Sequence, residues 1–148
     1  MFRGSSFHKI DAKGRIIIPT RFREVIKANG DDGVTISRMD RCLVAFPFNK
    51  WHEIETKILT MAKKSEKMRR FRRVFIGGAF ECNCYKQDRI LIPPSLRQYA
   101  ALDKEIVLVG VLDHFEIWSR DNWENENKVQ EEDMKEEEVR NEIARLGI

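Results

Sequence analysis

The sequence predicts a mainly β fold with short helices, in the all-β or α+β class, in which two related units form an intramolecular pseudo-dimer. Three observations lead to this prediction. The chain has 148 residues, of which 42% are hydrophobic, enough for one ordinary domain or two very small ones. It contains an internal repeat. A unit of about 50 residues buries too little apolar surface to be stable alone, so the two copies are expected to share a core with interleaved strands.

The repeat is visible without gaps. The segment RIIIPTRFREVI, which begins at Arg15, aligns with RILIPPSLRQYA, which begins at Arg89, with five identities in twelve positions. A second pair of segments, CLVAFPFNKW ending at Trp51 and HFEIWSRDNW ending at Trp123, lies at nearly the same separation. The chain therefore holds two copies of one unit.

Both copies predict the same order of elements. A short β-branched run (residues 16–18 and 90–92) meets a proline, which cannot donate to a sheet ladder and so ends the strand. Proline suits the first turn of a helix, and apolar residues at helical spacing follow it. A turn, two further strands and a short helix with a tryptophan complete each copy. The further strands are expected at residues 34–37, 43–46, 106–111 and 115–118.

The repeat divides the chain into four predicted parts. Residues 1–53 form the first repeat and residues 76–124 the second. Residues 54–75 between them are expected to be a helical connector, because apolar residues recur at helical spacing and both Gly and Pro are absent up to residue 73. Residues 125–148 form an acidic tail, for which a surface amphipathic helix and disorder both stay open.

The charge is distributed unevenly along the chain. Residues 1–120 carry 23 basic and 14 acidic side chains, whereas residues 121–148 carry four basic and ten acidic ones. A basic body with an acidic tail is typical of a protein that binds nucleic acid. Ordinary surface charge is the alternative.

Several classes of protein are not expected. No stretch approaches the ~18 apolar residues of a membrane helix, and the N-terminus lacks the apolar core of a secretory signal, so we expect a soluble, cytoplasmic protein without a membrane partner. Three cysteines cannot form a disulfide framework; Cys82 and Cys84 are interpreted as packed thiols. No catalytic or phosphate-binding motif is present, so we expect no enzymatic activity, cofactor, metal or small-molecule ligand.

The turn before the first repeated strand is the most informative segment. Asp11 and Arg15 bracket it, and Gly14 permits a positive φ angle. A guanidinium suits phosphate oxygens or the acceptor edge of guanine, and a carboxylate four residues earlier can hold it in one orientation. The alternative is an ordinary surface ion pair, worth about 0.2–1 kcal/mol.

At these residues the sequence resembles a known family. MFRG at the start, HKIDAKGRIIIPTRFRE from His8 to Glu24, and the second turn leading into RILIP are similar to the MraZ family, bacterial regulators of the division and cell-wall gene cluster built from two tandem SpoVT-AbrB domains. The resemblance covers residues 1 to about 125. It implies a double-split, swapped-hairpin AbrB-like β-barrel within one chain, a closed ring of such chains, and nucleoid-associated binding to direct repeats in promoter DNA.

Carried over residue by residue, the DxxxR motif of the family is intact in the first repeat and altered in the second. Where the family pattern has Asp and Gly, this chain has Tyr85 and Asp88. Asp88 or Glu81 is an alternative partner for Arg89, and Tyr85 either stacks on a sugar or packs on the strand. We therefore expect the first motif to dominate. The candidate DNA-binding residues are Arg3, Asp11, Lys13, Gly14, Arg15, Lys86 and Arg89.

A second basic segment, residues 63–73, carries seven basic side chains and one acidic one. It is interpreted as an auxiliary or subunit-facing surface, or as the solvated face of the connector. The sequence thus predicts a non-catalytic, sequence-specific DNA-binding regulator, expected to repress transcription as a homo-oligomer. The alternatives are an antitoxin-like protein of the AbrB fold and a purely structural ring protein, which a salt titration of promoter binding would separate.

Overall fold

Antiparallel strands form the centre of the molecule. The computed structural model describes residues 1–61, 65–84 and 88–148. Within these ranges, every pairing between strands is antiparallel, and the mainly β core with short helices that the sequence predicts is confirmed. The strands are β1 (Ser5–Lys9), β2 (Arg15–Ile17), β3 (Gly33–Met39), β4 (Cys42–Pro47), β5 (Phe80–Asn83), β6 (Arg89–Leu91), β7 (Glu105–Gly110) and β8 (Phe115–Ser119).

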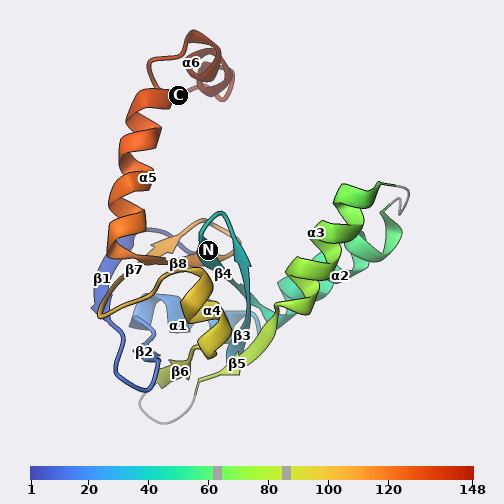
Figure 1. The fold of residues 1–148 in the computed structure, drawn as a ribbon, viewed down its shortest axis with the longest axis vertical. Coiled ribbons are helices and arrows are strands. Elements are labelled where there is room, and N and C mark those ends of the chain that lie inside the picture. The colour runs from blue at the N-terminus through green and yellow to red at the C-terminus, as the bar shows by residue number, and fades with distance from the viewer. Residues whose placement is uncertain (62–64, 85–87) are drawn as a thin grey trace.

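Six of these strands form one sheet in the order β1-β7-β8-β4-β3-β5 (Figure 1). The first strand of each repeat pairs with the third strand of the other, since β1 lies against β7 and β5 against β3. The fourth strands, β4 and β8, pair at the centre. If the two repeats are exchanged, the same strand order is obtained in reverse. The topology is therefore symmetric between the two halves of the chain.

The remaining strands, β2 and β6, pair with each other as a separate two-stranded sheet. Each has three residues and ends before a proline, Pro19 or Pro93, that precedes helix α1 (Thr20–Ala28) or α4 (Pro94–Tyr99). Because proline cannot donate to the ladder, this sheet stops there. The strand pairing of the described residues does not close. The barrel implied by the family resemblance is thus replaced by an open six-stranded sheet, with β1 and β5 at its edges, and a small sheet beside it.

Hydrophobic side chains cover both faces of the six-stranded sheet. One cluster joins the sheet to α1, α4, β2 and β6, and its centre is a group of three aromatic rings, Phe2, Phe22 and Phe115, with centroids 5.0–5.3 Å apart. The second cluster takes alternate residues such as Val44 and Val107, which point to the opposite face. The first cluster fixes the small sheet, because Ile16 and Ile90 on its inner face are fully buried.

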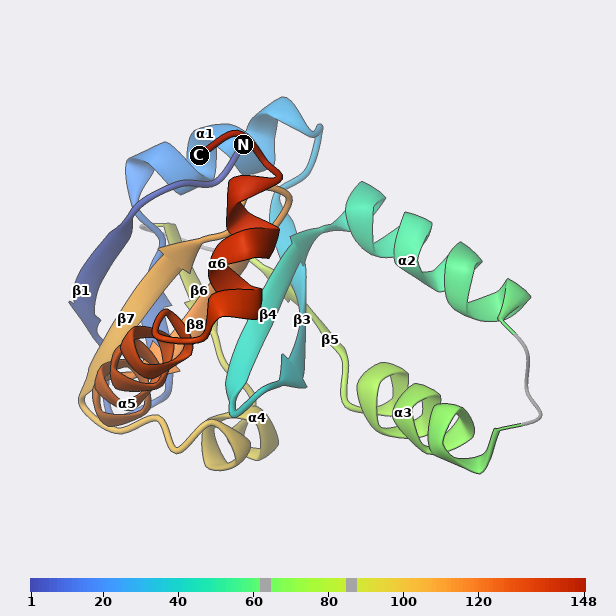
Figure 2. The same cartoon turned by 90° about the horizontal axis from the view of Figure 1, so that it is seen from above.

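Two helices, α2 (Phe48–Thr60) and α3 (Glu66–Gly77), follow β4 and project from the sheet side by side (Figure 2). The Phe75 ring of α3 packs on Trp51 of α2 with the ring centroids 5.2 Å apart, and on Phe71 with the centroids 5.1 Å apart. The proposed connector is helical where it is described, but its limits at residues 54 and 75 fall inside α2 and α3 rather than between elements.

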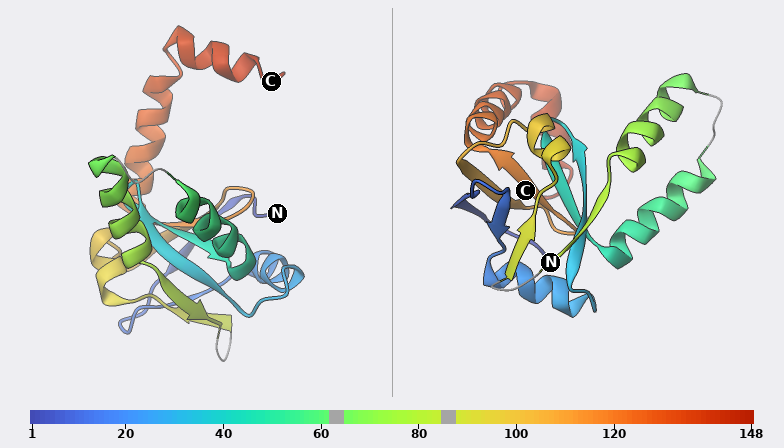
Figure 3. Two further views of the ribbon diagram at one scale, coloured as in Figure 1. Left: turned by 90° about the vertical axis from the view of Figure 1, so that its right-hand side faces the viewer. Right: turned by 60° about the horizontal axis from the view of Figure 1, so that its bottom comes forward.

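The chain ends in two helices, α5 (Arg120–Asp133) and α6 (Glu137–Ala144), which we call the C-terminal arm. The arm extends from the sheet at the opposite end from β2 and β6 (Figures 1 and 3). Neither helix has a buried residue. The acidic tail, for which helix and disorder were both open, is therefore helical and exposed.

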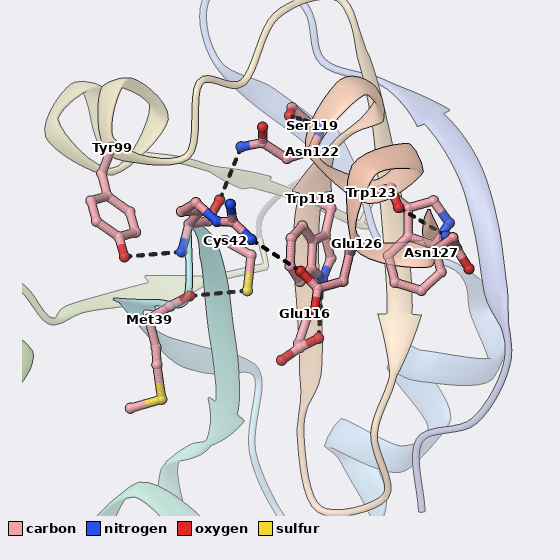
Figure 4. A network of polar contacts seen from close by, with 11 residues as sticks. Met39, Cys42, Tyr99, Glu116, Trp118, Ser119, Asn122, Trp123, Glu126 and Asn127 are labelled. Carbon is pink, nitrogen blue, oxygen red and sulfur yellow. Dashed lines mark hydrogen bonds and ion pairs between the residues drawn. The ribbon is translucent and has the colours of Figure 1, made fainter. Parts of the chain in front are cut away.

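Only the base of the arm is attached to the body (Figure 4). The Ser119 hydroxyl accepts a hydrogen bond from the backbone N–H of Asn122 at 3.1 Å, which caps α5. The Asn122 side chain donates to the carbonyl of Arg41 at 3.3 Å, and the Arg41 guanidinium contacts Glu126 at 3.3 Å. The β3–β4 turn of the first repeat therefore holds the arm of the second. In the described part of the chain, no helix is both long and apolar enough to cross a membrane.

Candidate nucleic-acid interface

The carboxylate of Asp11 closes the turn between β1 and β2. Its Oδ1 accepts hydrogen bonds from the backbone N–H groups of Lys13 and Arg15, each at 2.9 Å. Its Oδ2 accepts a third from Nε of Arg15 at 2.8 Å. Gly14 supplies the left-handed backbone that the turn needs, with φ +87°. The structure thus brings together the four residues that the sequence places in the first motif.

This arrangement keeps Asp11 charged and Arg15 oriented. The backbone N–H of Arg15, its side chain and the N–H of Lys13 lower the pKa of the Asp11 carboxyl below its ordinary value. The carboxylate is therefore ionised at neutral pH and holds Nε of Arg15. The Arg15 side chain is 35% exposed, and no hydrogen bond to its Nη atoms occurs among the described residues. The turn offers an oriented guanidinium fork for phosphate oxygens or a guanine edge.

Of the second turn the structure describes Asp88, whose backbone matches that of the equivalent residue of the first turn. Asp88 stands in the position of Gly14 and also has a positive φ, +59°. The Asp88 carbonyl accepts from the backbone N–H of Ile18 at 3.0 Å, just as the Gly14 carbonyl accepts from that of Ile92 at 2.8 Å. Asp tolerates this backbone region better than most residues, because its short polar side chain can bond locally. The positive φ is therefore kept at this position although the sequence has Asp in place of Gly.

The partners of Arg89 differ from those of Arg15. The Asp88 carboxylate forms its ion pair with Arg23 of the first repeat, and no ion pair joins Arg89 to Glu81 or Asp88 among the described residues. Nε of Arg89 is buried and has no hydrogen-bond partner there. The proposed replacement of the missing carboxylate by Asp88 or Glu81 is thus not seen. Tyr85 and Lys86, also candidates, lie outside the described residues.

The two turns lead into opposite ends of the small sheet, and its register places their arginines on one face. Arg15 is opposite Leu91, and Ile17 is opposite Arg89. All four side chains point away from the core, because the intervening Ile16 and Ile90 are buried. We call this outer face of β2 and β6 the ribbon face. It lies at the end of the molecule away from the acidic arm (Figure 1).

An arginine from the other repeat lies close to Gly14 and another to Asp88. The Arg97 guanidinium of α4 lies so close to Gly14 that a Cβ added there would be 2.7 Å from its Cζ. The equivalent Arg23 of α1 pairs with Asp88 and donates to the Ile18 carbonyl at 3.1 Å. Neither arginine was predicted from the sequence to belong to the site. The available signal was that they are identical at equivalent positions of the repeat.

Arg3 is not part of this cluster. It precedes β1, whose register with β7 runs from Ser5 opposite Val109 to Lys9 opposite Glu105. A strand of this length spans about 14 Å, so Arg3 and the Asp11 turn lie at opposite ends of β1. The carbonyl of Arg3 instead accepts a hydrogen bond from Arg21 at 3.4 Å. A contact from Arg3 to the ligand of the first turn therefore needs a ligand that extends along the strand.

The second basic segment also lies apart from the turns. Lys63 and Lys64 are outside the described residues, and the rest of the segment belongs to α3, which projects with α2 (Figure 2). Most of its basic side chains are exposed, and Arg70 contacts Glu66 at 3.7 Å. Residues 67–73 thus provide a basic surface separate from the turns, and the role of this surface stays a prediction.

The described residues contain no group of three or more His, Cys, Asp or Glu side chains that could hold a metal ion. Cys82 is buried, and burial raises the pKa of its thiol to about 12. Cys84 packs against the same core. His114 contacts Asp113 and Glu116 on the surface. Among the described residues, the Asp11–Arg15 pair provides a cation held in one orientation, which suits an anionic ligand.

Together, the fold and the site define a class: a β protein of two repeated units that exchange strands and present paired arginine turns on one face. Comparison with known proteins specifies the family. A family model described as "MraZ protein, putative antitoxin-like" matches residues 1–74 and again residues 75–145. The chain belongs to the MraZ family.

Similar proteins carry the name "Transcriptional regulator MraZ". The protein from Desulforapulum autotrophicum is 65% identical over 121 residues, 82% of each chain. That from Desulfosudis oleivorans is 52% identical over 148 residues, 100% of both chains, and that from Syntrophobacter fumaroxidans is 47% identical over 119 residues, 80% of this chain and 79% of that one.

Proposed function

We propose that this chain is a sequence-specific DNA-binding transcriptional regulator, a repressor of the division and cell-wall gene cluster that acts on the chromosome in the cytoplasm. The names of its relatives support the regulatory role. The observation that carries the DNA contact is the Arg15 guanidinium, which Asp11 holds through Nε at 2.8 Å and whose side chain is 35% exposed. Bidentate arginines of this kind are the commonest readers of guanine in the major groove.

The distribution of charge supports the same orientation on DNA. The ribbon face carries Arg15 and Arg89 with Lys13 nearby, while the ten acidic side chains of residues 121–148 lie in or near the arm at the other end. A duplex attracted to the ribbon face is thereby kept away from the acidic arm. Repression follows from occupancy of promoter DNA.

Ring assembly is the second part of the proposal. One chain presents only two turns, and so few phosphate contacts bind weakly at cellular salt, whereas several linked copies on direct repeats bind with avidity. Charge complementarity supports a contact between copies: the arm is acidic and has no buried residue, and α3 is basic and projects elsewhere on the body. The symmetric exchange of strands supports the description of each chain as a swapped-hairpin pseudo-dimer.

The test is a gel shift with DNA from the chain's own upstream promoter, with a salt titration and a duplex in which the direct repeats are scrambled. We expect log affinity to fall by about 0.9 per contacted phosphate for each decade of salt. Scrambling is expected to remove most of the affinity. Salt-independent binding, or equal affinity for both duplexes, would contradict the proposal.

Assembly is tested on the same protein by sizing. Removal of residues 128–148 deletes most of the arm but keeps Asn122 and Glu126, which attach its base. The truncated chain is expected to stay folded and to run as a smaller particle. An unchanged particle size would show that the arm does not join the copies.

The alternative functions make different predictions. An antitoxin-like protein is expected to have a C-terminal segment that folds on its toxin, but α5 and α6 are already helical in the isolated chain. The arm therefore gives no support to that function. A purely structural ring would assemble without salt-dependent affinity for the promoter, which the gel shift measures directly.

A further inference from the structure

Two aliphatic side chains are exposed in the middle of the ribbon face. Ile17 is 51% exposed and Leu91 is 39% exposed. The residues adjacent to each along the chain are isoleucines that are at most 1% exposed. Arg15 and Arg89 lie two residues before Ile17 and Leu91. Single exposed aliphatic residues are common on protein surfaces. Here, however, the two occupy equivalent positions of the two repeats and lie on one short sheet.

The register arranges these side chains in an alternating pattern with the arginines. Arg15 is directly opposite Leu91, and Ile17 is directly opposite Arg89. Ile17 and Leu91 are therefore diagonal neighbours, about 7–8 Å apart. Along each strand the arginine and the aliphatic residue are about 7 Å apart, which matches two base-pair steps of 3.4 Å. Exchange of the two repeats leaves the pattern unchanged.

The flanking charges indicate what covers this apolar pair. An apolar protein partner would have to bury the guanidinium of Arg15, which is expensive without a matching carboxylate. A major groove accommodates a two-stranded sheet and offers acceptors for arginine beside it. Among the groups on base edges in that groove, the C5-methyl of thymine is the apolar one. Phosphates would give an aliphatic side chain no favourable contact.

We propose that Ile17 and Leu91 are specificity-determining residues that contact thymine methyl groups in the major groove while the arginines beside them contact guanine or phosphate. This rests on the proposed function. It adds that the operator is read by two aliphatic side chains, and that the preferred sites carry thymine about two base pairs from the arginine contacts.

The experiment removes the methyl group from the DNA and the side chain from the protein, separately and together. Promoter duplexes are prepared with single thymines replaced by uracil, which lacks only the C5-methyl. Wild-type affinity is expected to fall about fourfold at the contacted positions, as expected for one buried methyl. Ile17→Ala or Leu91→Ala is expected to bind the unmodified duplex more weakly, and to lose its sensitivity to uracil at the matching position.

Leu112→Ala is the matched control. Leu112 is 53% exposed in the turn between β7 and β8, away from β2 and β6. This variant is expected to keep both the wild-type affinity and the sensitivity to uracil. Sizing and thermal unfolding of every variant verify that particle and fold are unchanged, which is expected because the replaced side chains are exposed.

The outcomes separate this proposal from the proposed function. If all proteins bind the promoter with salt dependence but none responds to uracil, the aliphatic contacts are wrong and the regulator stands. If Ile17→Ala changes the particle size and not the uracil response, the apolar pair joins copies of the chain. If the wild type does not bind its promoter at all, both proposals are overturned.

Discussion

The first turn, at Gly14 and Arg15, and the described end of the second turn, at Asp88 and Arg89, share backbone features but differ in side-chain chemistry. Gly14 and Asp88 both adopt positive φ angles, and the carbonyl of each accepts a hydrogen bond from the backbone N–H of an isoleucine in the opposite repeat. In the first turn a carboxylate from the turn itself orients Arg15, whereas in the second Asp88 pairs with Arg23 and Nε of Arg89 has no described partner. The matching backbone contacts of Gly14 and Asp88 thus follow from the pairing between the repeats, whereas the side-chain chemistry depends on single residues that can change independently.

The largest effect on promoter affinity is expected from replacing the arginines of the two turns. Arg15→Ala should reduce affinity for the promoter duplex about 10- to 100-fold, because every chain of the assembly loses the oriented guanidinium of its first turn. Arg89→Ala should reduce it less, since no carboxylate orients that side chain. Binding isotherms at fixed salt measure both, with the exposed arm variant Arg140→Ala as a control. A greater loss from Arg89→Ala would refute the ranking of the two turns.

The glycine of the first turn gives the next largest effect. Gly14→Ala should lower the free energy of unfolding by about 1–2 kcal/mol, because an L residue is strained at this φ and the new Cβ would meet the Arg97 guanidinium. Asp88→Gly should change it little, because relief of the positive φ offsets the lost ion pair with Arg23. Urea unfolding of the two variants tests this, and equal losses of stability would argue against strain from the positive φ at these two positions.

A smaller effect should come from restoring the family pattern in the second repeat. The double variant Tyr85→Asp, Asp88→Gly supplies the missing carboxylate and glycine, and promoter affinity should rise about two- to fivefold, the value of one exposed ion pair. In this double variant, Arg89→Ala should reduce promoter affinity as much as Arg15→Ala does. If the double variant binds no better and Arg89→Ala stays mild, the second turn does not contact DNA.

The smallest effect concerns the proton on Asp11. Its carboxyl should titrate below its ordinary value of 3.8, as followed by NMR of the side chain. Because the pKa is lowered on folding, the contribution of this group to stability is complete above its unfolded pKa and is lost as pH falls through the lowered one. Arg15→Ala should move the titration midpoint of Asp11 only part of the way back to its ordinary value, because the backbone N–H groups of residues 13 and 15 still donate to the carboxylate. A titration at or above 3.8 in the wild type would mean that the turn is open.

The elements defined by local pattern could be predicted from sequence. Pro19 and Pro93 end the two short strands and precede the helices, and the alternation of buried and exposed residues follows the β-branched runs. The first strand, β1, was not predicted, because SSFHK has little strand preference and is held by its pairing with β7. The barrel was expected from resemblance and is not closed, because short, proline-limited strands pair only with each other.

The same distinction applies to the candidate site. The Asp11–Arg15 pair spans four residues, so its spacing in sequence was sufficient to predict it. The contacts of Arg97 with Gly14 and of Arg23 with Asp88 join residues more than 60 positions apart. Such contacts depend on how the repeats exchange strands, and no local pattern encodes them. Arg3 is near the first turn in sequence but is separated from it by β1, and its candidate role as a phosphate contact stays a prediction.

The central claim, that the first turn lies against the double helix, is tested most directly by photocrosslinking. A photoreactive phenylalanine derivative is introduced in place of the exposed Lys13, and separately in place of Leu112 at a distant turn and Arg140 in the arm. On irradiation with promoter DNA, position 13 is expected to form a protein–DNA crosslink that competing scrambled duplex does not remove. Crosslinks from positions 112 or 140, with none from position 13 in protein that still binds the promoter, would contradict it.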